Sequence, residues 1–173
     1  MVVGNLIVEG KILSNSETNL DNALDTLQSR IGQSNTASDW FEVTQDRIDG
    51  FAEVTMDHQW IHVDVEKAKS GPFGEPIAHG HLTLSIMGHL PKTESVPGPK
   101  LEGQKLSINY GFDKVRFPSP VPVGAQIRAT STLKRAEIKG GMIETMNEVV
   151  VEVKGQDKPV SYTHLTLPTN REV

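Results

Sequence analysis

The sequence predicts an α+β fold in which an antiparallel sheet wraps around one long central helix. Two observations support this expectation. A segment that starts near Gly80 is apolar on most of its sides, as in a helix buried inside a domain. The stretch 106–153 alternates apolar and polar residues between turn signals, which is typical of long antiparallel strands. A sheet and a helix of this kind pack as two layers around one core.

The composition narrows the range of function classes. The chain has 173 residues, the size of one domain, and a net charge of −5. It has no basic block of the kind that binds nucleic acid, and no apolar run that approaches the about 18 residues of a membrane-spanning helix. The absence of cysteine removes disulfides, thiolate nucleophiles and cysteine-type zinc sites. We therefore expect a cytoplasmic protein that neither binds nucleic acid nor inserts into a membrane.

The first residues form a separate part of the expected organisation. Residues 1–37 are predicted to be an arm with one helix, because apolar side chains recur at intervals of three and four over residues 20–31. The small, polar residues at 33–38 favour a loop. The main domain is expected over residues 38–160.

The first half of the main domain is predicted to mix short strands and helices. Proline at position 91 ends the last of these elements, because it lacks a backbone donor. In order, the expected elements are a strand at 40–43, a helix that starts after Thr44 and ends near residue 56, a strand at 61–65, a helical turn at 66–69 and the central helix from Gly80 to Leu90.

The second half is predicted to be β. Three strands are expected at 106–117, 125–133 and 142–153, and Gly140–Gly141 is the hairpin signal between the last two. A sheet of this kind needs one more strand after residue 160 to cover the edge of the strand at 142–153.

The end of the chain departs from this pattern. Pro168 and Asn170 interrupt the sequence where the further strand is expected. We hypothesise that residues 161–173 are a non-native tail, translated from adapter or cloning sequence, that replaces a native final strand. Such a loss is expected to leave an unpaired strand edge and a thinner core.

Two polar elements are candidates for chemistry. Asp57 and His62 lie five positions apart across a predicted helix end, and a carboxylate and an imidazole held together can share the two halves of a proton transfer. Gly80 lies at the predicted N-terminus of the central helix. Free N–H groups at such a position stabilise negative charge that develops on a carbonyl oxygen.

Three separated segments resemble one protein family in their order and spacing. They are Asp57-x4-His62, Gly71-Pro-Phe-Gly and Pro76-Ile-Ala-His-Gly80, and together they resemble the MaoC-like dehydratase family, which includes the (R)-specific enoyl-CoA hydratases. The string Asp-His-Gln-Trp-Ile-His-Val-Asp is closer to the branch that contains nodulation protein N and related 3-hydroxyacyl-thioester dehydratases. The resemblance covers roughly residues 38–160. One departure is Met56, which stands where the common family pattern has glycine.

The resemblance implies a hot-dog fold, in which the sheet wraps around one long helix, and a homodimer. It implies that Asp57 and His62 hold one water molecule as an acid–base pair, that the Gly80 N–H polarises a thioester carbonyl, and that Ser85 lies near the pair. The implied reaction is the reversible hydration of 2-enoyl thioesters to (R)-3-hydroxyacyl thioesters. It needs no metal and no cofactor, and coenzyme A or acyl carrier protein serves as the carrier of the substrate.

Two other functions stay open at this level. One is a hot-dog acyl-CoA thioesterase, which uses an acidic residue to activate water against the thioester carbon. The other is a non-catalytic acyl-thioester-binding protein on the same fold. The spacing of Asp57 and His62 favours the hydratase over both. His79 is expected to be a hydrogen-bonded structural residue, and a zinc site built from the neighbouring histidines is disfavoured.

Overall fold

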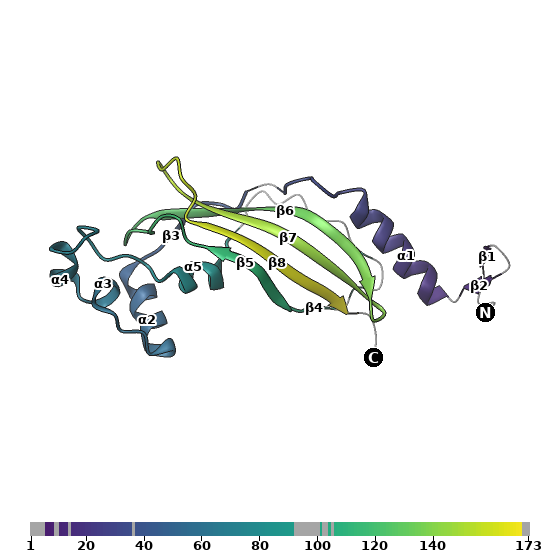
Figure 1. The fold of residues 1–173 in the computed structure, drawn as a ribbon, viewed down its shortest axis with the longest axis horizontal. Helices are drawn as coiled ribbons and strands as arrows, with labels where there is room; N and C mark the ends of the chain where they lie inside the picture. Colours follow the sequence, from purple (N-terminus) through teal and green to yellow (C-terminus); the bar gives the residue numbers. More distant parts are fainter. Residues whose placement is uncertain are drawn as a thin grey trace.

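One antiparallel sheet dominates the computed structural model, which describes residues 6–8, 11–13, 15–35, 37–91, 101, 104 and 106–170 (Figure 1). The strand order is β3-β6-β7-β8-β4, and β5 also pairs with β8. Every neighbouring pair of strands runs antiparallel. The strands are β3 (Phe41–Glu42), β4 (Leu106–Ser107), β5 (Gly111–Arg116), β6 (Gln126–Lys139), β7 (Met142–Val153) and β8 (Ser161–Asn170).

The long hairpin of β6 and β7 forms the middle of the sheet. Its turn is made by Gly140 and Gly141, whose φ angles of 57° and 78° give the left-handed conformation that a tight hairpin requires. The hairpin predicted from these glycines is confirmed, although β6 runs to Lys139 and not only to residue 133. The strand predicted at 106–117 is divided into β4 and β5, which both lie along β8.

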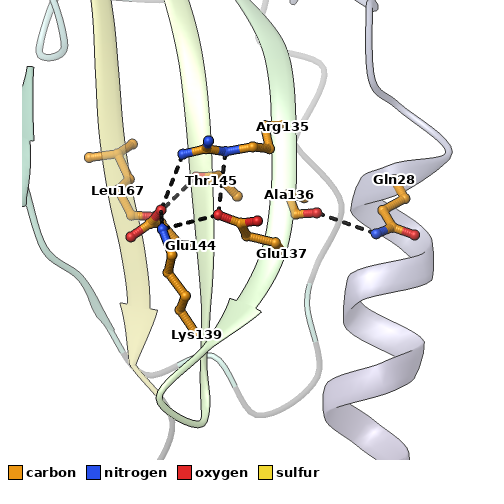
Figure 2. Close-up of polar contacts among 8 residues, drawn as sticks. All are labelled: Gln28, Arg135, Ala136, Glu137, Lys139, Glu144, Thr145 and Leu167. Carbon is orange, nitrogen blue, oxygen red and sulfur yellow. Dashed lines mark hydrogen bonds and ion pairs between the residues drawn. The ribbon is translucent and has the colours of Figure 1, made fainter. Parts of the chain in front are cut away.

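Charged side chains join the two strands near the tip of this hairpin (Figure 2). Glu144 on β7 accepts a hydrogen bond from Lys139 Nζ at 2.8 Å and lies 3.3 Å from Arg135 Nη2. Glu137 forms a further ion pair with each of these two cations. Because the contacts to Glu144 cross from β6 to β7, they favour the observed register of the hairpin.

Helices α2 to α5 lie together at one end of the sheet (Figure 1). The helix predicted after Thr44 and the turn predicted at 66–69 are confirmed as α2 and α4. The strand predicted at 61–65 is wrong, because residues 60–63 form α3 and Asp64 then caps α4 by accepting the Lys67 N–H at 3.0 Å. Over so short a stretch, the preference of β-branched residues for strands is too weak to decide the conformation. The helices are α2 (Gln45–Thr55), α3 (Trp60–Val63), α4 (Val65–Lys69) and α5 (Gly80–Ile86).

Helix α5 is the predicted central helix, and it packs on the sheet. Leu82, together with Met87 just beyond the helix end, belongs to the main hydrophobic core. The helix ends at Ile86, four residues earlier than predicted, because the chain turns around Gly88, a poor helix former. His81 is exposed, so α5 is buried on its sheet side and not all round.

The end of the chain forms strand β8, which corrects the expectation that residues 161–170 interrupt the sheet. This strand pairs with β7 from Ile143 to Val151 and with β5 on its other side. The edge of β7 is therefore covered. Pro168 lies near the end of the strand, where the loss of one backbone donor is tolerated. The non-native origin of residues 161–173 stays a prediction.

Helix α1 (Asn15–Gln28) confirms the predicted N-terminal helix and packs on β6 and β7. Gln28 Nε2 donates a hydrogen bond to the carbonyl of Ala136 on β6 at 3.3 Å (Figure 2). A second, smaller hydrophobic core lies here, made of Ala23, Leu27, Ala136 and Ile143.

A two-stranded hairpin of β1 (Leu6–Val8) and β2 (Lys11–Leu13) precedes α1 in the chain. In the part of the chain that the structure describes, none of the helices combines the length and the apolar character that crossing a bilayer would require. The stretch of chain between α2 and α5 carries several polar residues, among them Asp57 and His62.

Candidate active site

The turn after α2 carries Asp57. Met56, the residue before it, ends α2 with φ 61° and ψ 22°, the one positive φ outside glycine among the described residues. Glycine adopts this left-handed conformation without the steric cost that a Cβ brings, which accounts for the glycine at this place in the family pattern. The Asp57 side chain is about half exposed, at 54%.

His62 is a buried imidazole on α3, with 7% of its surface exposed. Its Nδ1 lies 2.7 Å from the carbonyl oxygen of Ile77. Because a carbonyl oxygen only accepts, Nδ1 carries the proton, and the neutral ring keeps Nε2 free to accept one. Burial lowers the pKa of His62, the Ile77 bond opposes this effect, and neighbouring His79 lowers the pKa while Asp57 raises it. The proton-accepting form is therefore present near neutral pH.

His79 lies between these two residues. Its Nε2 donates a hydrogen bond to the backbone carbonyl of Asp57 at 2.9 Å and lies 4.0 Å from Asp57 Oδ2. Its ring stacks on that of His62, with centroids 3.8 Å apart and an interplanar angle of 27°. The ring is only 2% exposed and hydrogen-bonded, as predicted for His79.

The structure brings Asp57 and His62 together, as their spacing predicts. The Asp57 carboxylate and one ring nitrogen each of His62 and His79 lie within 4.8 Å of one another. One water molecule bridges a gap of this size, since two hydrogen bonds to the same oxygen span about 4.6 Å at a tetrahedral angle. The arrangement therefore suits proton transfer to and from a bound water.

The same three residues each offer one possible ligand atom to a metal ion. One nitrogen of each histidine ring already contacts a backbone carbonyl, which leaves one nitrogen per ring for any other partner. The expectation that disfavours a zinc site stays a prediction.

A cavity of about 360 Å³ lies beside the pair. His62 and Gly80 line it, whereas Asp57 lies outside the lining. Gly80 is needed at its wall, because a Cβ at this position would lie 2.8 Å from the ring of Phe117. The other lining residues are Phe73, Ile77, Ala78, Thr83, Pro118, Ser119, Pro120, Val121 and Val160. The lining of the cavity is mainly apolar with a few polar side chains, as in sites for small organic ligands.

Gly80 is the first residue of α5, so its N–H has no partner within the helix. The helix has about two turns, so its dipole stabilises negative charge at this position less than the dipole of the longer predicted helix would. The N–H itself is therefore the main source of electrostatic stabilisation that the position offers.

The structure does not bring Ser85 to the pair. Ser85 is exposed, and its hydroxyl donates to the backbone carbonyl of His81 at 2.8 Å. Five positions along a helix turn a side chain about 140° away from Gly80, whereas three positions leave it on nearly the same face. Thr83 accordingly lines the cavity, and its spacing of three from Gly80 is the signal that the sequence analysis missed.

Comparisons with known proteins agree with this picture. A family model described as "MaoC like domain" matches residues 26–155. The chain is 47% identical over 131 residues to 3-hydroxyacyl-thioester dehydratase Z of Mycobacterium tuberculosis, covering 75% of this chain and 82% of that protein. It is 42% identical over 139 residues to Nodulation protein N of Rhizobium leguminosarum bv. viciae, covering 79% and 84%. Its fold is similar to that of the (R)-hydratase from A. caviae involved in PHA biosynthesis, with a TM-score of 0.63, 21% identity and coverage of 81% and 96%.

Proposed function

Because this chain belongs to the MaoC-like dehydratase family, we propose that it is a hydro-lyase that interconverts 2-enoyl thioesters and (R)-3-hydroxyacyl thioesters. One structural observation supports the proposal in addition to family membership. Asp57 and His62 meet within the reach of one water molecule, beside an apolar cavity that Gly80 lines. A thioester in this cavity would have its carbonyl close to a free N–H and its double bond close to a base and a water.

In the hydration direction, His62 acts first as the base. Its Nε2 takes a proton from the bound water while the Asp57 carboxylate accepts the other hydrogen of that water and orients it. The water oxygen forms a bond to C3 of the enoyl group, and the electron pair of the double bond moves onto the thioester carbonyl oxygen. The imidazolium then returns its proton to C2, so that the product has gained one hydroxyl and one hydrogen.

Gly80 acts on the negative charge that forms between these two steps. The enolate-like intermediate carries its charge on the carbonyl oxygen, and the Gly80 N–H donates to that oxygen. The position of Gly80 at the first residue of α5 and on the cavity lining supports this role. An N–H aimed at a developing oxyanion is worth more in an apolar cavity than in water, because nothing needs to reorganise as the charge appears. Ser85 has no part in this step, since its hydroxyl is bound to the His81 carbonyl outside the cavity.

The proposal extends to the carrier and to the assembly. Coenzyme A or acyl carrier protein carries the acyl group, no metal or cofactor takes part, and the enzyme works in the cytoplasm as a homodimer. Exposed apolar side chains at and before the edge strand β5 support the dimer, namely Ile108, Tyr110 and Phe112.

The test is the loss of the conjugated enoyl-thioester absorbance of crotonyl-CoA. We expect rapid loss with the wild-type chain and an at least about hundredfold slower reaction with Asp57→Asn, which removes the carboxylate that orients the water, and with His62→Gln, which removes the group that transfers the proton. His58→Gln is the matched control, because His58 is exposed and pairs only with Glu53 at 3.7 Å. The product should be (R)-3-hydroxybutyryl-CoA by chiral analysis.

Measurement of thiol release distinguishes this function from that of a thioesterase and from that of a non-catalytic binding protein. Hydration leaves the thioester intact, so a thiol reagent should detect no free coenzyme A. Release of coenzyme A at the rate of absorbance loss would instead identify a thioesterase. Binding of crotonyl-CoA by a folded protein with no change in absorbance, across short and long enoyl chains, would identify a non-catalytic acyl-thioester-binding protein.

A further inference from the structure

His79 contacts the parts of the chain that carry all three proposed catalytic groups. It donates to the Asp57 backbone at 2.9 Å, stacks on the ring of His62 and directly precedes Gly80. It is not among the residues that line the cavity. We propose that His79 is a positioning residue, which fixes Asp57 and His62 relative to each other and to Gly80 without touching the substrate. The inference rests on the proposed function.

The hydrogen bond to Asp57 also sets the tautomer of His79. The carbonyl oxygen only accepts, so Nε2 carries the proton and the neutral ring has an unprotonated Nδ1. Among the described residues, this Nδ1 is buried without a hydrogen-bond partner. An unsatisfied buried acceptor costs stability, so its presence needs a reason beyond packing. Phe51 packs against the ring at 5.1 Å, with His62 stacked on it at 3.8 Å, so the orientation of the ring is fixed.

The bond matters because the Asp57 side chain is half exposed. An exposed carboxylate takes its position from the backbone that carries it, and the His79 bond fixes that backbone directly after the left-handed turn at Met56. A shift of about 1 Å at such a group is enough to lower a reaction rate by about two orders of magnitude.

The segment 77–80 organises the whole site. Ile77 supplies the carbonyl that holds His62, His79 holds Asp57, and Gly80 supplies the oxyanion donor. The segment is itself anchored on two sides, because the Ile77 N–H donates to Ile61 at 3.0 Å and the Ala78 N–H to Val121 at 2.8 Å. His79 is the one member of this segment whose side chain reaches both acid–base residues.

Two substitutions separate the two contacts of His79. His79→Phe keeps a stacked ring and loses the donor, whereas His79→Gln keeps an amide N–H and loses the ring. We expect each to lower kcat for crotonyl-CoA hydration at least about tenfold while KM stays within about twofold, because the substrate does not contact the residue. His58→Phe and His58→Gln, made next to Asp57 on an exposed histidine, should leave both constants within about twofold.

The pH profile supplies a readout that loss of folding alone does not move. The ionisable groups that face His62 are Asp57 and His79, and removal of His79 takes away one influence that disfavours protonation of His62. The acid limb of kcat/KM should therefore move to higher pH in both variants. Circular dichroism and thermal unfolding should show a folded protein. If the Phe variant does not fold, the Gln variant is judged by the same criteria.

The outcomes distinguish this inference from the proposed function. No turnover by the wild-type chain overturns the proposed function, and this inference with it. Turnover by the wild type with unchanged kcat in a folded His79 variant overturns the inference alone. A fall in kcat that follows a fall in the fraction of folded protein, with the acid limb in place, would assign His79 a purely structural role and overturn it as well.

Discussion

In the proposed reaction His62 acts as a base only while its imidazole is neutral, and its surroundings set the pH at which that holds. Burial is the largest influence and lowers its pKa from the ordinary 6.5. Protonation as the pH falls through this lowered pKa removes the base, so kcat/KM for crotonyl-CoA should decline with a midpoint below 6.5. A pH series of the initial rate measures the midpoint, with His58→Gln as the control that keeps it. A midpoint at or above 6.5 would contradict the buried, neutral His62.

Met56 carries a backbone cost that glycine would not have. Its φ of 61° is left-handed, and its side chain is 83% exposed, so little packing is lost on its removal. Met56→Gly should raise the free energy of unfolding by about 0.5 kcal/mol, the difference between relief of the Cβ clash and the added entropy of the unfolded chain. Urea denaturation measures the change. Met56→Ala, which keeps the Cβ, is the matched control and should give no gain.

The residues of the site divide clearly into those that the sequence predicts and those that it does not. Asp57, His62 and Gly80 follow from residue type and spacing. The end of α2 just before Asp57 and the start of α3 shortly after it bring Asp57 and His62 together. Ser85 was predicted by resemblance alone, and the rotation of a helix places Thr83 on the cavity instead. The stacking of His79 on His62 depends on two segments that meet only in the folded chain, so no local pattern contains it.

Strand β8 has polar residues on its buried face. Ser161 and Thr163 are fully buried, and their hydroxyls share a hydrogen bond of 3.1 Å. Thr163→Val alone should destabilise the protein by about 1 kcal/mol, because it leaves the Ser161 hydroxyl without this partner in the core. The double substitution Ser161→Ala and Thr163→Val should be neutral or stabilising, since both polar groups leave together.

Thermal or urea unfolding of the two single variants and the double variant gives the coupling between these residues. Strictly additive losses would show that the hydroxyls do not depend on each other. This polar inner face also explains why the strand was not predicted. Alternation of apolar and polar residues is the signal for a strand, and β8 fills buried positions with serine and threonine.

Three other elements show where local sequence patterns are sufficient to predict the secondary structure and where they are not. Helix α2 has its N-cap position at Thr44, its apolar face and its end in the sequence, and the structure confirms these three, although the Thr44 side chain makes no cap hydrogen bond. The stretch 61–65 has β-branched residues but too few of them to form a strand, and residues 60–63 form α3. Helix α5 ends early at Ile86, because the backbone turns around Gly88 although the apolar pattern continues.

At the scale of the whole molecule, the α+β class and the hot-dog architecture are predicted correctly. Long alternating segments with clear turns predict an antiparallel sheet, and the order β6-β7-β8 follows once each of these strands pairs with the next along the chain. The places of β3 beside β6 and of β4 and β5 beside β8 do not follow from this rule. The place of the last strand was predicted as well, as the missing partner of β7. The sequence pattern does not predict that residues 161–170 themselves form this strand. They do so because pairing with β5 on one side and β7 on the other outweighs their weak local preference for the strand conformation.

The cohesion of the sheet therefore depends on its last strand, whatever its origin. A chain that ends at Val160 loses the partner of β7 from Ile143 to Val151 and the only strand that holds β5 among the described residues. It also uncovers the buried face that β8 contributes to the core beside Val149 and Val151. We expect this truncated chain to aggregate or to remain unfolded, because it would expose a long unpaired edge. Circular dichroism and size-exclusion chromatography measure the outcome, with a chain that ends at Asn170 as the control. A folded species of the same size and thermal stability as the full chain would show that β8 is dispensable.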